Sequence, residues 1–238
     1  MTELFQPLAH DTPFRFHCGP DVTCFNRCCR NLNQFLYPYD VVRMARALGL
    51  SAGEFLACYT RRHVGPETGL PVVSLKPQMP GRHCPLVTLQ GCRVYNDRPA
   101  SCRLYPLARA VVRDPQTGSI EERFALIRED HCQGHGGGTQ WDARRWIENQ
   151  GLSPYNCNND PLLAVIAFKR HRHPQPLPPQ VGDAIYESLY LFADTPDVSD
   201  GKSTLAATAA RPADFTEIEG RLSAAYDAVV EILKESAR

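Results

Sequence analysis

Four cysteines lie within twelve residues near the start of the chain, and this crowding constrains the fold more than any other feature. Cys18 is followed by Cys24 and then by the adjacent pair Cys28 and Cys29. Scattered cysteines act as small apolar residues, but thiols grouped this tightly either pair as disulfides or bind a metal. The redox compartment decides between the two, because disulfides rarely persist in a reducing environment.

The rest of the sequence favours a metal in a reducing compartment. The 238 residues include ten cysteines, and the N-terminus shows no basic segment followed by an apolar core. No apolar run approaches the roughly 20 residues that span a bilayer. We therefore expect a cytoplasmic protein. Its formal net charge of zero gives no electrostatic reason to bind nucleic acid or a membrane surface, and we expect neither partner.

Local signals predict short helices in the first part of the chain. Residues 1–34 are expected to be irregular, apart from a short helix over residues 24–32. Asp40 is expected to cap the next helix. Ser51 and Glu54 have the spacing of a capping box and predict a further helix that continues through the Glu-Phe-Leu-Ala-Cys-Tyr-Thr-Arg-Arg-His stretch.

Strand signals occupy the middle of the chain. The β-branched residues of 67–76 predict a strand, and residues 107–113 and 120–127 predict a hairpin closed by an Asp-Pro-Gln-Thr-Gly turn. We expect an α+β fold, in which a small antiparallel sheet and cysteine-bearing loops combine with short N-terminal helices and a helical C-terminal region. The expected division is a cysteine-cluster metal-binding domain over 1–138, with a helical region over 139–238 packed on it.

Helical patterns recur in that C-terminal region. Thr139 is expected to cap the first of them and a proline to open the second. The polar stretch 195–212 is expected to be a flexible linker. The predicted helices cover residues 140–150, 161–172, 182–193 and 214–238.

The predicted helix over 24–32 would arrange its thiols in a specific way. Residues i and i+4 share a helix face, so Cys24 and Cys28 would point to one metal. Cys29 would lie about 100° further round the helix, towards a second centre or a ligand brought by another segment. The adjacent pair Cys28 and Cys29 would then supply ligands in two directions, for a site that one helix face cannot complete.

Four further thiols complete the candidate set of metal ligands, which is Cys18, Cys24, Cys28, Cys29, Cys84, Cys92, Cys102 and Cys132. Eight thiols could form two four-ligand sites, or one site with extra thiols. Their spacing matches neither paired zinc knuckles nor a bacterial ferredoxin run, so zinc and iron–sulfur both remain open. Cys58 lies in an apolar stretch and is expected to be a buried apolar residue instead.

The cysteine pattern resembles that of the YkgJ family of zinc- or iron-chelating cysteine-cluster proteins. The similarity begins with Cys-x5-Cys-x3-Cys-Cys, ends with a Cys-x-Gly-x-Gly-like stretch at Cys132, and covers roughly residues 14–138. A second block is similar to the family's Cys-Pro…Cys…Tyr-x-x-Arg-Pro-x-x-Cys-Arg-x-x-Pro, with Cys84, Pro85, Cys92, Tyr95, Arg98, Pro99, Cys102, Arg103 and Pro106 in the matching places. The resemblance implies a metal or iron–sulfur site.

A distant similarity to flagellin lysine N-methylase implies a [4Fe–4S] cluster and leaves S-adenosylmethionine open as a further cofactor. Arg98 and Arg103 flank Cys102 and are the candidate cofactor-binding residues, because arginine can donate to sulfur or hold a carboxylate. The alternative for both is ordinary ion pairing that fixes a loop.

We expect a metal-binding protein that carries a [4Fe–4S] cluster and acts in redox or cluster-dependent chemistry with a protein redox partner or a protein substrate. Two alternatives remain: an S-adenosylmethionine-dependent enzyme similar to the protein lysine methylases, and a structural zinc protein. The sequence identifies no catalytic residue and no oligomeric state.

Overall fold

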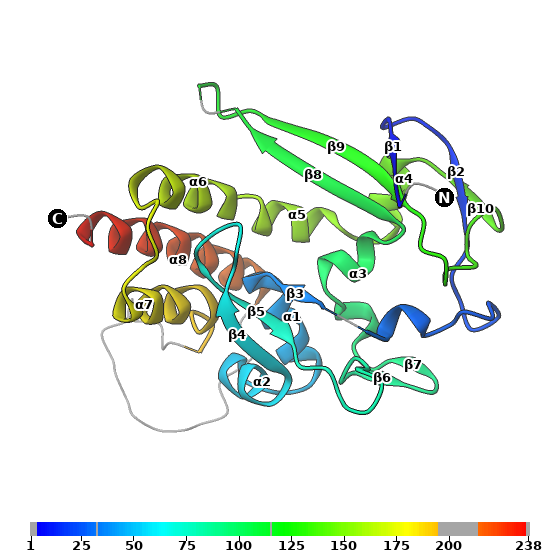
Figure 1. Ribbon diagram of the computed structural model, residues 1–238, viewed down its shortest axis with the longest axis horizontal. Coiled ribbons are helices and arrows are strands. Elements are labelled where there is room, and N and C mark those ends of the chain that lie inside the picture. The colour runs from blue at the N-terminus through cyan, green and yellow to red at the C-terminus, as the bar shows by residue number, and fades with distance from the viewer. Residues whose placement is uncertain (1–3, 32, 115, 195–213, 237–238) are drawn as a thin grey trace.

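The computed structural model describes residues 4–31, 33–114, 116–194 and 214–236, and it has the expected α+β architecture (Figure 1). The strands are β1 (Phe5–Leu8), β2 (Phe14–Phe16), β3 (Phe35–Leu36), β4 (Thr60–Val64), β5 (Pro71–Leu75), β6 (Val87–Thr88), β7 (Gly91–Cys92), β8 (Leu107–Arg113), β9 (Ile120–Ile127) and β10 (Thr139–Trp141). The helices are α1 (Pro38–Ala47), α2 (Ala52–Tyr59), α3 (Ala100–Leu104), α4 (Ala143–Asn149), α5 (Ser153–Asn159), α6 (Leu162–Arg172), α7 (Pro179–Tyr190) and α8 (Phe215–Glu235), with short 3-10 turns η1 (Arg27–Cys29) and η2 (Tyr95–Asp97).

The hairpin of β8 and β9 forms over the predicted residues. Leu107 pairs with Leu126 and Arg113 with Ile120, and the Asp114 carboxylate accepts backbone N–H groups in the turn. The sequence did not predict β1, which adds antiparallel to the outer edge of β9. One face of this sheet packs with the aromatic side chains of β2 and α4 in a small core.

A second antiparallel sheet has the strand order β3-β5-β4. The capping box of α2 forms as predicted, with Ser51 N–H donating to Glu54 at 2.8 Å. The prediction that helix continues past α2 is wrong, because Thr60 starts β4 and pairs with β5. Asp40 is not the cap of α1: the helix starts two residues earlier, at Pro38, and the Asp40 carboxylate accepts the Tyr37 N–H at 2.9 Å from inside the first turn.

The C-terminal helices form largely where helical patterns predicted them, with two differences. Thr139 is not a helix cap but the first residue of β10, which pairs with β2, and Asp142 caps α4 instead. The sequence did not predict α5. The predicted linker over 195–212 lies outside the described residues.

Helices α5–α8 share one hydrophobic core with α1, α2 and β5. The apolar face of α8 is buried in this core as the sequence predicted, with Leu222 and Val229 fully enclosed. The division into residues 1–138 and 139–238 stays a prediction. None of the helices that the structure describes combines the length and the apolar character needed to cross a membrane.

Candidate metal centre

The segment that carries the first four cysteines is a chain of tight turns. Backbone N–H groups donate across three residues, from Arg27 to Cys24 at 2.9 Å and from Cys29 to Asn26 at 3.2 Å. Of the predicted helix over 24–32, only the 3-10 turn η1 forms, because Asn26 has a φ of 65° and breaks the right-handed path. Cys24 and Cys28 therefore do not share a helix face.

The turn segment is anchored to the hairpin of β6 and β7. Asn26 Nδ2 donates to the Thr88 carbonyl at 3.0 Å, and the Phe25 ring lies against Gly91. Gly91 has a φ of 118°, and a Cβ there would lie 3.2 Å from that ring, so only glycine fits without strain. This anchoring brings the first cysteine block to the second.

Backbone and side-chain contacts join the second block to the first. The Cys84 N–H donates to the Cys29 carbonyl at 2.8 Å. Cys92 lies in β7, and Cys102 lies in α3, where its thiol donates to Gln34 Oε1 at 3.6 Å. Gln34 immediately precedes β3, so this contact ties Cys102 to the segment that follows the first cysteine block.

The third segment, around Cys132, lies against the other end of the turn segment. The Gln133 N–H donates to the Cys24 sulfur at 3.3 Å, and the His17 N–H donates to the Gly134 carbonyl at 3.0 Å. Gly134 has no room for a side chain, because a Cβ there would lie 2.4 Å from the His17 carbonyl oxygen. Three cysteine segments that are distant in sequence therefore meet in space.

The pKa values of the thiols reflect how close the cysteine segments lie to one another. Burial, with a further contribution from the Cys28 thiol, raises the pKa of Cys18 and of Cys84 to about 11. Although the residue Cys102 is exposed overall, dense protein around its sulfur raises the pKa of its thiol, and Cys84 and Cys28 add to this. The pKa of Cys92 is also raised by burial and by Cys28. Cys28 thus acts on thiols of both blocks.

The adjacent pair has thiols of opposite character. The thiols of Cys28 and Cys29 interact, and stabilisation of the Cys28 thiolate by the Cys29 thiol lowers the pKa of Cys28. The same interaction, with burial, raises the pKa of Cys29. Neighbouring thiols with raised pKa values keep their protons unless a cation compensates the charge of the thiolates. A metal that binds to this cluster would therefore displace protons from it.

The two candidate arginines have different surroundings. The residue Arg103 is 8% exposed, and its guanidinium donates to three backbone carbonyls, those of Arg98 at 3.1 Å, Gln150 at 2.7 Å and Asn96. Arg98 donates to the Tyr95 carbonyl at 2.6 Å, and its charge lowers the pKa of Cys18 and Cys92 against the larger effect of burial. Arg98 therefore acts on the cysteine cluster electrostatically, whereas Arg103 fixes the loop that carries Cys102.

Two cysteines lie apart from this arrangement. Cys58, on α2, is exposed, so the prediction that it is a buried apolar residue is wrong. The helix α2 turns its other face, with Phe55 and Leu56, into the core. Cys157 is exposed on α5.

Buried polar atoms near Cys132 were not predicted from the sequence. The Tyr105 hydroxyl and both ring nitrogens of His135 are buried and have no hydrogen-bond partner of normal geometry in the part of the chain that the structure describes. The Cys132 thiol lies close enough to Tyr105 to raise the pKa of that hydroxyl, after burial. Only the His131-Cys132-Gln-Gly-His135 stretch hinted at polar groups here.

The donor set fits a thiophilic metal or cluster. All eight candidate thiols are free, and unpartnered polar atoms lie beside one of them. Across the described ranges, however, no three His, Cys, Asp or Glu side chains lie close enough together to bind a single ion. Coordination therefore requires the thiols to move together from the positions that the turns and hydrogen bonds now give them.

Comparison with known proteins gives one match. Residues 17–133 match the CxxCxxCC family model, described as "Putative zinc- or iron-chelating domain". No curated protein and no solved structure matches the chain. The matched range contains all eight candidate cysteines and ends before Cys157.

Proposed function

Residues 17–133 belong to this family of zinc- or iron-chelating domains, and on that premise we propose that the chain binds a [4Fe–4S] cluster through thiolates from three segments. The observation that carries the proposal is the position of Cys28, whose thiol acts on Cys18 in its own segment and on Cys84 and Cys102 in the second block. Cys132 joins the same group because Cys24 contributes to the raised pKa of the Cys132 thiol, and because the N–H of the neighbouring Gln133 donates to the Cys24 sulfur.

The number of thiols favours iron–sulfur over zinc. A structural zinc site takes four ligands, commonly from paired knuckles, whereas eight thiols from loops without knuckle spacing suit a cluster with additional thiols nearby. Arg98 would offset part of the negative charge, because its guanidinium already acts on Cys18 and Cys92. When bound, the cluster would supply one-electron redox chemistry.

The proposed setting is the cytoplasm, with a protein redox partner or a protein substrate. A reducing compartment keeps clustered thiols available to a metal, and all ten cysteines are free here. No feature of the residues that the structure describes favours S-adenosylmethionine, so methyl transfer is not part of the proposal.

Anaerobic purification followed by iron, sulfide and zinc analysis tests this proposal. We expect iron and acid-labile sulfide in equal amounts, and a broad visible absorption band that bleaches on reduction. A colourless protein with stoichiometric zinc would replace the proposal with a structural zinc site. A protein that binds neither metal would overturn both.

A further inference from the structure

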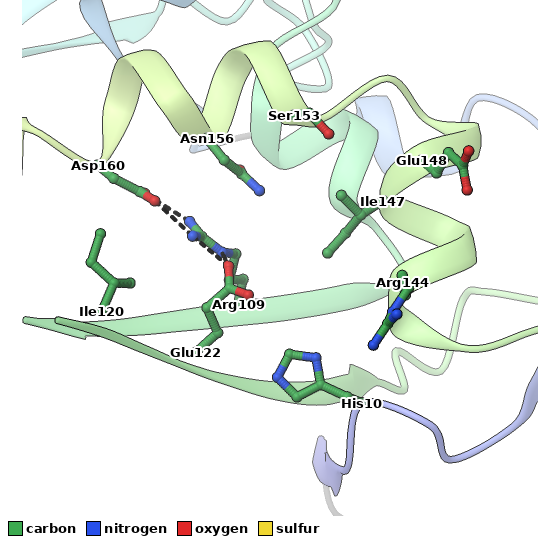
Figure 2. A pocket seen from close by; sticks show the side chains of 10 residues that line it. All are labelled: His10, Arg109, Ile120, Glu122, Arg144, Ile147, Glu148, Ser153, Asn156 and Asp160. Carbon is green, nitrogen blue, oxygen red and sulfur yellow. Dashed lines mark hydrogen bonds and ion pairs between the residues drawn. The ribbon is translucent and has the colours of Figure 1, made fainter.

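An open cavity of about 800 Å³ lies between the β8–β9 hairpin and helices α4 and α5, and none of the candidate cysteines lines it (Figure 2). This volume is within the range of about 300–1,000 Å³ that is typical of small-molecule sites. Its lining is mostly polar and carries both signs of charge. The residues are His10, Arg109, Ile120, Glu122, Arg144, Ile147, Glu148, Ser153, Asn156 and Asp160.

One wall of the cavity is a fixed network with an excess of negative charge. Arg109 donates to both Asp160 oxygens, at 2.8 and 2.7 Å, and to Glu122 Oε1 at 2.6 Å. Its side chain is only 9% exposed, and the two carboxylates hold it from β9 and from the end of α5. Because one arginine faces two carboxylates, the network has one uncompensated negative charge.

This wall still has hydrogen-bonding capacity for a ligand. Both contacts from Arg109 go to the same Glu122 oxygen, which leaves the second oxygen available. Figure 2 shows the Asn156 amide pointing towards Arg109 from α5, so it adds a polar group beside the carboxylates. The available Glu122 oxygen matches a ligand ammonium, which donates up to three hydrogen bonds.

The other wall carries the positive charge of Arg144, and Glu148, one turn further along α4, also lines the cavity. Arg144, on α4, is exposed and forms no ion pair with any carboxylate in the described ranges. Figure 2 shows Arg144 and His10 on the side of the cavity away from Asp160. An arginine without a carboxylate partner in a cavity matches a ligand carboxylate, which it can bind through two hydrogen bonds.

A smaller hollow of about 420 Å³ continues from the cavity, sharing His10 and Glu122. Its other lining residues include Pro7, Leu8 and Phe124, so its character is mainly apolar. A ligand whose ammonium binds at Glu122 could therefore place an apolar group in this hollow.

From these three features we infer that the cavity binds a free α-amino acid with an apolar side chain. The ammonium binds at the second Glu122 oxygen, the carboxylate binds at Arg144, and the side chain occupies the smaller hollow. The inference does not depend on the metal proposal, because the two sites share no residue.

Calorimetric titration of the full-length protein, as isolated with its metal, tests the inference with three related compounds. L-Leucine carries both charges, N-acetyl-L-leucine lacks the ammonium, and L-leucinamide lacks the carboxylate. We expect L-leucine to bind, and each of the other two to bind at least about tenfold more weakly, since one lost charge-assisted contact is worth about 1.5–3 kcal/mol.

Two neighbouring arginines provide a matched pair of variants. Arg144→Ala should weaken L-leucine binding about tenfold and leave the weak L-leucinamide binding unchanged. Arg145→Ala should change neither, because exposed Arg145 does not line the cavity. The inference is overturned if L-leucine does not bind at millimolar concentration, if all three compounds bind equally, or if the two variants behave alike.

Discussion

Replacing Asp40 with asparagine tests how the fold positions the cysteine loop. Asp40 has no exposed surface, and its carboxylate accepts N–H groups from Tyr37 and from Ala100, each at 2.9 Å. It thereby ties the start of α1 to the start of α3, the helix that carries Cys102. The Asp40→Asn variant keeps the shape of the side chain and removes its charge.

The size of the effect follows from the acidity of Asp40. Burial raises its pKa from the ordinary 3.8 to about 6, outweighing the two N–H groups and Arg103, which lower it. Between these values the folded chain holds a proton that the unfolded chain releases, so the stability of the wild type falls as the pH rises through this window. The whole difference is about 3 kcal/mol, of which about 1.4 kcal/mol falls between about pH 5 and about pH 7.

Urea unfolding of both proteins, followed by far-UV circular dichroism, measures this difference. The wild type should lose about 1.4 kcal/mol more unfolding free energy than Asp40→Asn when the pH rises from about 5 to about 7. Comparing the two proteins cancels the other groups that titrate in this range. A gap between them that stays constant with pH, or that changes in the opposite direction, would refute the account of Asp40.

Three further changes test the cysteine cluster and its support. Cys28→Ser should lose most of the bound metal in elemental analysis, whereas Cys58→Ser, at an exposed site away from the cluster, should keep it. Arg103→Lys should lower the free energy of unfolding in urea by about 2–4 kcal/mol, because it leaves buried carbonyls without donors. Metal removal should expose residues 80–106 to limited proteolysis while residues 139–172 stay protected, since metal binding to the folded state alone stabilises the loops it ligates.

Each of these three has a clear opposing outcome. Equal metal loss in both cysteine variants would remove the distinction between clustered and isolated thiols. For the arginine, Arg93→Lys on an exposed side chain is the control, and an equal loss of stability in both variants would contradict a specific role for Arg103. Identical cleavage maps with and without metal would show that the metal does not order the loops.

The elements that the sequence predicted well are those whose signals are local. The β8–β9 hairpin depends on a turn whose aspartate accepts neighbouring N–H groups, and the start of α2 depends on a Ser-x-x-Glu box. Both signals lie within a few residues, so no knowledge of the rest of the fold is needed. The long apolar stripe of α8 is likewise a local pattern.

The elements that it missed depend on distant partners. The strands β1, β2 and β10 have three or four residues each and exist because they pair with segments more than one hundred residues away. The helix predicted over 24–32 failed because Asn26 adopts a left-handed conformation, which its short side chain tolerates. The spacing of the cysteines could identify the candidate ligands. It does not reveal the backbone hydrogen bond from the Cys84 N–H to the Cys29 carbonyl, which joins the first two cysteine blocks.

In the proposed metal centre, thiols from three separate segments bind one kind of metal. X-ray absorption spectroscopy at the iron edge, on the full chain purified anaerobically, tests this most directly because it identifies the atoms bound to the metal. We expect a first shell made only of sulfur, with iron neighbours at the distance of a cluster. A shell of nitrogen and oxygen atoms, or the absence of stoichiometric iron together with the absence of zinc, would contradict it.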